Sequence, residues 1–70
     1  MEFVDVYDLV DVTIDYGNYI ECEREVITPA LKAAGYSVGT WRTGEGDSFG
    51  PLSRCVTISK DGVNKVAVYG

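Results

Sequence analysis

The stretch RCVTISKDGVNKVAVY, residues 54–69, predicts a β-hairpin. Asp61 and Gly62 separate two runs rich in β-branched residues, and an Asp-Gly pair in this position is the strongest short-range signal for a tight hairpin turn. Such a turn fixes which residues face each other. The predicted pairs are Lys60 with Val63, Ile58 with Lys65, Val56 with Ala67, Thr57 with Val66, and Cys55 with Val68. Both faces carry apolar side chains, so we expect a helix to cover one and a partner or a second copy to cover the other.

An amphipathic helix is predicted ahead of the hairpin, from Tyr19 to Ala34. Apolar residues recur in this segment at spacings of three and four, which gathers them on one face of a helix. Asn18 and Glu21 have the spacing of a capping box, in which the Asn side chain accepts a bond from a free amide and the Glu reaches back. Gly35 supplies the left-handed residue that commonly ends a helix.

Pro29 interrupts this helical pattern. Proline has no backbone N–H to donate, and its ring crowds the preceding turn of a helix. We therefore expect either a kink at this position or two short helices, with Thr28 capping the second of them.

Two further strands are predicted, one on each side of the helix. Val10 to Tyr16 is rich in β-branched residues, which lose rotamer freedom in a helix, and a short helical turn is expected before it. Tyr36 to Thr43 alternates in the manner of a strand, which places Val38 and Trp41 on opposite faces. Gly39 weakens this second strand.

Together these elements predict a small α+β fold in which residues 1–70 form a single globular domain. The expected order is one strand, one helix and then three strands, which gives a mostly antiparallel sheet of three to four strands with the helix packed on a face. A chain of 70 residues buries only about 60% of its unfolded surface, so we expect marginal stability.

The acidic residues are concentrated at the start of the chain. Eight of the eleven lie between Glu2 and Glu25, with Arg24 as their one basic neighbour, so residues 1–25 carry a formal charge of −7. The remaining residues carry five basic and three acidic side chains, or +2. An acidic surface attracts cationic surfaces and repels nucleic acid. We therefore expect a protein partner with a basic surface, and no direct binding of nucleic acid.

Several classes of site find no support in the composition. The chain has no histidine, which removes most zinc sites and the nucleophiles that depend on a histidine base. The acidic residues do not have the spacing of a calcium loop. We expect no catalytic site, no metal and no cofactor, and we expect Cys22 and Cys55 to be reduced thiols in a cytoplasmic protein. The sequence predicts neither a membrane span nor a signal peptide.

The candidate partner-binding residues are the acidic side chains near the start of the chain and one aromatic residue in the glycine-rich segment 43–51. They are Asp5, Asp8, Asp11, Asp15, Glu21, Glu25 and Phe49. Glu23 belongs to the same run of acids. Carboxylates spaced along one face imitate the phosphates of a nucleic acid and speed the encounter with a cationic groove. Aromatic side chains on loops are frequent anchors of interfaces. The alternative is that the acids only solvate an exposed face.

In its type the chain resembles the small intracellular inhibitor proteins that viruses and mobile elements encode, some of which act as DNA mimics. This resemblance implies an inhibitor or adaptor that docks its acidic face on a nucleic-acid-binding surface of another protein. A second hypothesis is a structural or assembly module that forms a homo-oligomer, such as a homodimer, through the hairpin of residues 54–69. A small-molecule or metal-binding domain is the third.

Overall fold

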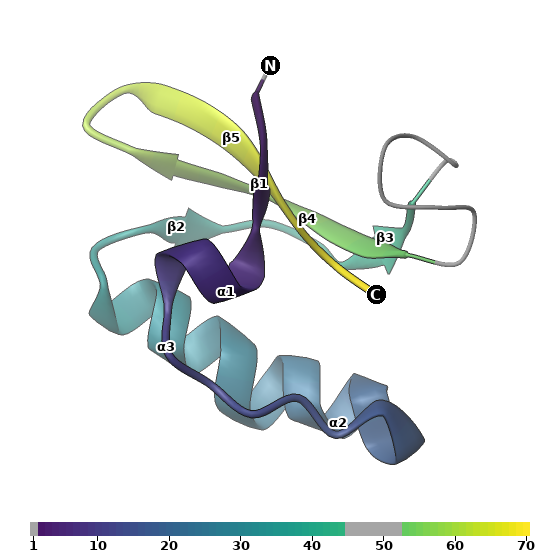
Figure 1. Cartoon of the computed structure of the whole chain (residues 1–70). Coiled ribbons are helices and arrows are strands. Elements are labelled where there is room, and N and C mark those ends of the chain that lie inside the picture. The colour runs from purple at the N-terminus through teal and green to yellow at the C-terminus, as the bar shows by residue number, and fades with distance from the viewer. Residues whose placement is uncertain (1, 45–52) are drawn as a thin grey trace.

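The predicted hairpin is the centre of a mixed sheet, and one long helical run packs on a face of that sheet (Figure 1). The computed structural model describes residues 2–44 and 53–70. In chain order, the elements in these ranges are β1 (Glu2–Asp5), α1 (Val6–Leu9), η1 (Tyr16–Asn18), α2 (Tyr19–Cys22), η2 (Glu23–Ile27), α3 (Thr28–Ala33), β2 (Ser37–Val38), β3 (Arg42–Thr43), β4 (Arg54–Lys60) and β5 (Val63–Tyr69). The fold is α+β, as the sequence predicted.

The turn between β4 and β5 has the geometry that its sequence specifies. Asp61 and Gly62 both have positive φ, 54° and 79°, which is the backbone of the tight turn that matches the twist of a hairpin. All five residue pairs predicted for the hairpin are present.

The other strands flank this hairpin, in the order β1-β5-β4-β2, with β3 also paired to β4. β2 and β3 are antiparallel to β4, as expected, but β1 is parallel to β5. The helical run lets β2 start in the same direction as β1. The two antiparallel pairings of β2 with β4 and of β4 with β5 then return β5 to that direction, so β5 pairs with β1 in parallel.

The prediction for the N-terminal segment was wrong in its placement. The strand lies at Glu2–Asp5, the helical turn α1 follows it, and Val10 to Tyr16 is not a strand. Asp5 ends the strand because its carboxylate accepts a bond from the amide of Tyr7 (2.9 Å) and caps α1. The segment after α1 runs beside the helical run and buries Ile14 (Figure 1). Its β-branched residues therefore pack on the core without pairing as a strand. Strand propensity does not distinguish these two situations, because it largely measures side-chain packing.

Pro29 is accommodated by a wide helical turn. The amide of Thr28 bonds to the carbonyl of Glu23, five residues earlier, so that η2 is a π-helical turn. Widening the helix at this point relieves the crowding that the proline ring causes in a regular α-helix. The run from Tyr19 to Ala33 is therefore continuous, and Thr28 is not an N-cap because its own backbone is helical and no side-chain cap bond is present.

The two ends of the helical run differ in how well the sequence predicted them. At the start, Asn18 donates its side-chain amide to the Glu21 carboxylate (3.2 Å) and makes no bond to a backbone amide, so the predicted capping box is not formed. At the end, Gly35 has a φ of 98°, and the amide of Tyr36 bonds to the carbonyl of Leu31 (3.1 Å). This is the predicted glycine-ended helix.

The core lies between the helical run and the sheet. Its buried residues are Val6, Ile14, Cys22, Ile27, Leu31, Val56, Ile58, Ala67 and Tyr69. On the opposite face of the sheet, Cys55, Val66 and Val68 form a second buried cluster. Cys22 and Cys55 thus belong to different clusters, and no disulfide joins them. None of the helices in the two described ranges is long and apolar enough to cross a lipid bilayer.

Trp41 faces the helix because of a bulge in the sheet. The strand predicted from Tyr36 to Thr43 is broken into β2 and β3, and residues 39–41 stand opposite only Val56 and Thr57. One extra residue reverses the alternation of side chains beyond it. Val38 and Trp41 therefore pack on the same core cluster, although the sequence predicted opposite faces. The indole Nε1 donates to the hydroxyl of Thr28 (2.8 Å).

Candidate functional site

Three of the predicted acidic residues meet at one groove. Asp15, Glu21 and Glu25 line a groove of about 210 Å³ between the segment that follows α1 and the first half of the helical run. The same groove is lined by Thr13, Asn18, Cys22 and Val26. All three carboxylates belong to exposed residues. We call this set of Asp15, Glu21 and Glu25 the acidic groove.

The other predicted site residues do not join the acidic groove. Asp5 is half-buried and caps α1. Asp8 and Asp11 are exposed but do not line the groove. Phe49 lies outside the described residues. The acidic side chains near the start of the chain are thus only partly gathered into one surface.

The acidic groove keeps most of its negative charge. Glu25 pairs with Arg24 at 3.2 Å, but both side chains are more than half exposed, and a surface pair of this kind is weak. Within residues 2–44 and 53–70, Asp15 and Glu21 form no ion pair. The three carboxylates of the groove are therefore offset only by the weak, solvent-screened pair with the guanidinium of Arg24.

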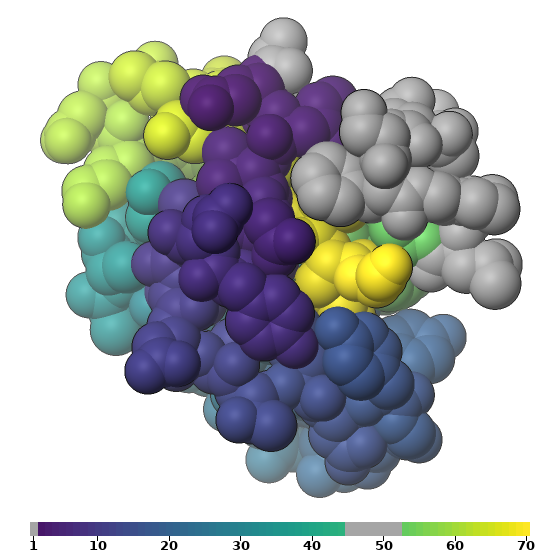
Figure 2. Space-filling model, in the orientation of Figure 1, coloured from purple at the N-terminus to yellow at the C-terminus, as the bar shows by residue number. Residues whose placement is uncertain are grey.

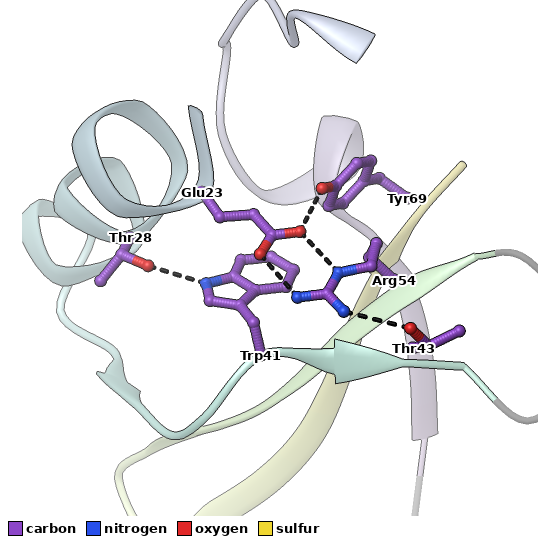
Figure 3. A network of polar contacts seen from close by, with 6 residues as sticks. All are labelled: Glu23, Thr28, Trp41, Thr43, Arg54 and Tyr69. Carbon is purple, nitrogen blue, oxygen red and sulfur yellow. Dashed lines mark hydrogen bonds and ion pairs between the residues drawn. The ribbon is translucent and has the colours of Figure 1, made fainter. Parts of the chain in front are cut away.

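Glu23 does not belong to the exposed acidic surface, which the sequence interpretation missed. It is only 3% exposed, and Arg54 binds both of its carboxylate oxygens, through Nε and Nη2, at 2.9 Å each (Figure 3). The hydroxyl of Tyr69 donates to the same carboxylate. A signal existed in the sequence, because Glu23 precedes the buried Ile27 and Leu31 at intervals of four and therefore lies on the apolar stripe of the helix.

The surrounding contacts hold this pair in place. The second amino group of Arg54 donates to the hydroxyl of Thr43 (3.2 Å), and the guanidinium carbon lies 5.4 Å from the ring centre of Tyr19. The ring of Tyr69 makes an edge contact with Trp41 (5.6 Å between centres), and Trp41 is itself bonded to the helix through Thr28. Figure 3 shows these side chains converging from the helical run, β3, β4 and β5. A fully satisfied polar network of this kind rigidifies a core.

The protonation states in this network follow from its contacts. Burial, together with the hydrogen bond to Glu23, raises the pKa of the Tyr69 hydroxyl above its ordinary value. The hydrogen bond to Glu23 raises the pKa of the Arg54 guanidinium. At neutral pH the network therefore consists of a cation, a carboxylate and a neutral phenol, and the two charges offset each other.

A pocket of about 300 Å³ opens beside this network. Its lining residues are Tyr16, Tyr19, Thr43, Arg54, Tyr69 and Gly70, and we call it the tyrosine pocket. Figure 2 shows the purple N-terminal segment, the blue start of the helical run and the yellow end of β5 meeting on this face of the molecule. Tyr16 is 58% exposed and its ring centre lies 6.1 Å from that of Tyr69. Its hydroxyl lies 3.3 Å from that of Tyr7, and this hydrogen bond raises the pKa of Tyr16.

Comparison with known protein families, with characterised proteins and with solved structures found no match for this chain. In the part of the chain that the structure describes, no group of three or more acidic or cysteine side chains lies close enough to hold a metal ion. What the geometry offers is an exposed anionic groove next to a rigid aromatic pocket.

Proposed function

We propose that this protein is a protein-binding inhibitor or adaptor, and that the acidic groove docks on a basic, nucleic-acid-binding surface of its partner. The observation that carries the proposal is that Asp15, Glu21 and Glu25 line one groove, and that among the described residues only Arg24 forms an ion pair with any of them. Complementary charge steers two proteins toward each other and suppresses association with acidic competitors. The compositional resemblance to small inhibitors of viral or mobile-element type is the reason for proposing inhibition.

The position of the groove suits docking. Asp15 is held by a bond from the amide of Gly17 (2.9 Å), and Glu21 is held by the side chain of Asn18. Two of the three carboxylates are thus oriented before a partner arrives, which lowers the entropic cost of ordering them. Their charges stay exposed, so the desolvation penalty of binding remains moderate.

The alternative of a homo-oligomer built through the hairpin has less support. β5 already lies between β1 and β4, and β4 already pairs with β2 and β3, so neither hairpin strand offers a long free edge. On the face away from the helix, Cys55, Val66 and Val68 are buried within the single chain. Within residues 54–69, Val63 beside the turn is the one exposed large hydrophobic side chain, so little apolar area of the hairpin is left for a second copy.

Two variants with the same change in charge test the proposal. The groove variant combines Asp15→Asn, Glu21→Gln and Glu25→Gln, and the control variant combines Glu2→Gln, Asp8→Asn and Asp11→Asn, which are exposed positions outside the groove. Both raise the net charge by three. Proteins from the native host are captured on each immobilised variant at about 50 mM and about 500 mM salt, at which the screening length differs severalfold.

A specific partner should be retained by the unmodified protein and by the control variant, and lost with the groove variant. It should also be released at high salt and by added duplex DNA, since DNA competes for the same basic surface. If the partner is retained equally by the two variants and at both salt concentrations, the charge of the groove is not the basis of binding. Sedimentation at several concentrations tests the alternative, which requires a mass that grows with concentration.

A further inference from the structure

The tyrosine pocket is built as a rigid receptor. One wall is the ring of Tyr69, which is buried and fixed by contacts with Trp41 and Glu23. Another is the guanidinium of Arg54, which is held by three hydrogen bonds to Glu23 and Thr43. Side chains that are immobile before binding lose little conformational entropy on binding. The volume of about 300 Å³ lies at the lower limit for ligand pockets, which suits one side chain or a small planar group.

The charges at the pocket favour an uncharged occupant. Arg54 is a cation on the pocket wall, but both carboxylate oxygens of Glu23 already neutralise it. An anionic ligand would have to compete with this pair and would lie close to Asp15, the chain neighbour of Tyr16. The lining also includes Thr43 and Gly70 and the rings of Tyr16, Tyr19 and Tyr69, which offer faces and edges for aromatic stacking.

The rim of the pocket has the composition of an interface. Tyr16 and Tyr19 are 58% and 40% exposed, and the exposed Tyr7 lies beside Tyr16, with the two hydroxyls 3.3 Å apart. Tyrosine is enriched in protein interfaces because its ring gives a large contact area while its hydroxyl tolerates water. An aromatic side chain of a partner, inserted into a desolvated pocket, is the usual form of an interface hot spot.

The pocket and the acidic groove share one structural element. Between Asp15, the N-cap of η1, and Glu21 in α2, Tyr16 and Tyr19 line the pocket, whereas Asp15, Asn18 and Glu21 line the groove. Asp15 and Tyr16 are chain neighbours, as are Asn18 and Tyr19, so a partner segment that crosses this part of the chain meets residues of both the groove and the pocket. We propose that the tyrosine pocket takes an aromatic side chain that is carried within a basic segment of the partner. This inference rests on the proposed function, because the groove selects the basic residues and the pocket selects the aromatic one.

Three synthetic peptides of equal length test the proposal. The first carries one tryptophan flanked on each side by two arginines, the second replaces the tryptophan with alanine, and the third keeps the tryptophan but replaces the arginines with serine. Each is titrated into the isotopically labelled protein, and binding is followed by the shifts of backbone amide signals. We expect the first peptide to bind at least about tenfold more tightly than either of the others, with the largest shifts at Tyr16, Tyr19 and Gly70.

Matched variants identify the site. Tyr19→Ala removes a pocket wall at a 40% exposed position, and Phe3→Ala removes an equally exposed aromatic ring, 43%, from a strand outside the pocket. Tyr19→Ala should abolish the preference for tryptophan while it leaves the binding of the alanine peptide unchanged. Phe3→Ala should leave both unchanged. The amide spectrum of each variant also shows whether it is folded.

The outcomes separate this inference from the function on which it rests. Equal affinity of the two basic peptides, with binding lost in the groove variant, overturns the aromatic pocket and leaves the acidic docking surface intact. Equal affinity of the two tryptophan peptides overturns the requirement for a basic segment. If none of the peptides binds, both the inference and the proposed mode of docking are wrong.

Discussion

Glu23 and Arg54, 31 positions apart in the chain, form a bidentate ion pair that joins the helical run to the central strand β4. The two sequence neighbours of Glu23 do not share this role, because Cys22 packs in the core and Arg24 forms an exposed pair with the next glutamate. Glu23 alone of these three residues joins the helix to the sheet by an ion pair. The pair lies under the tyrosine pocket and fixes the orientation of Arg54 there.

Removing the charge of Glu23 should destabilise the fold strongly. Glu23→Gln leaves the largely buried guanidinium of Arg54 without its counterion, a loss of about 3 kcal/mol for a buried pair. Glu21→Gln, the same change at an exposed position, should stay within about 0.5 kcal/mol. The measurement is urea unfolding followed by the fluorescence of Trp41, the single tryptophan.

The coupling between the two partners can be measured separately. Glu23→Met combined with Arg54→Met removes both charges and keeps the volume, so the double variant should be more stable than Glu23→Met alone. If the effects of the two single changes simply add, the ion pair contributes nothing specific.

Stability should fall at alkaline pH because of Tyr69. The raised pKa of its hydroxyl means that the native state keeps the proton after the unfolded chain has lost it. The stabilisation is therefore complete below about pH 10 and declines above it, by about 1.4 kcal/mol for each pH unit. Tyr69→Phe should be less stable at neutral pH, since Glu23 loses a donor, but should show a shallower decline between about pH 10 and pH 11.5. Parallel curves for the two proteins would contradict this assignment.

Gly35 should resist substitution for two separate reasons. Its φ of 98° is unfavourable for any residue with a Cβ, and an added Cβ would lie 3.2 Å from Cε of Lys60, whose ammonium bonds to the carbonyl of Ala34 (2.9 Å). Gly35→Ala should cost about 1–2 kcal/mol. Gly35→Asn should cost less, because asparagine adopts left-handed backbone more readily. A smaller loss for alanine than for asparagine in thermal unfolding would argue against this account.

Trp41→Phe should report on the contact between the bulge and the helix. The change keeps an aromatic ring near Tyr69 but removes the bond to Thr28, which is worth about 1 kcal/mol. Thr28→Ser retains a hydroxyl and should be close to neutral, whereas Thr28→Val should match Trp41→Phe. The measurement is chemical unfolding followed by circular dichroism, because Trp41→Phe removes the tryptophan whose fluorescence would otherwise report unfolding. A loss with Thr28→Ser as large as with Thr28→Val would mean that the hydroxyl is not the relevant group.

Local signals predicted the parts of the fold that short-range rules control. The Asp61-Gly62 turn fixed the register of the hairpin, and Gly35 fixed the end of the helix, because each requires a backbone conformation that few residues adopt. The helix itself followed from its apolar periodicity. The strand at Glu2–Asp5 was missed because its parallel pairing with β5 depends on a contact more than 60 residues away along the chain.

The candidate site was less accessible to sequence reasoning. Trp41 was assigned to the wrong face because a single extra residue in the bulge shifts the alternation. Gly39 is a local signal for a bulge, but it was interpreted only as weakening the strand. Glu23 was grouped with the exposed acids on charge alone, although its spacing to Ile27 placed it on the buried stripe. The sequence predicted an acidic face over the first 25 residues but not which acidic side chains line one groove. That depends on how the segment after α1 runs beside the helix.

The end of β5 has a practical consequence for anyone who handles this protein. Gly70 lines the tyrosine pocket directly after Tyr69, so an affinity tag or fluorescent fusion attached there would sit at its mouth. In Figure 1 the first residues of β1 lie at the end of that strand that points away from the helical run. No residue of β1 lines the tyrosine pocket or the acidic groove, so attachment before β1 keeps a tag away from both.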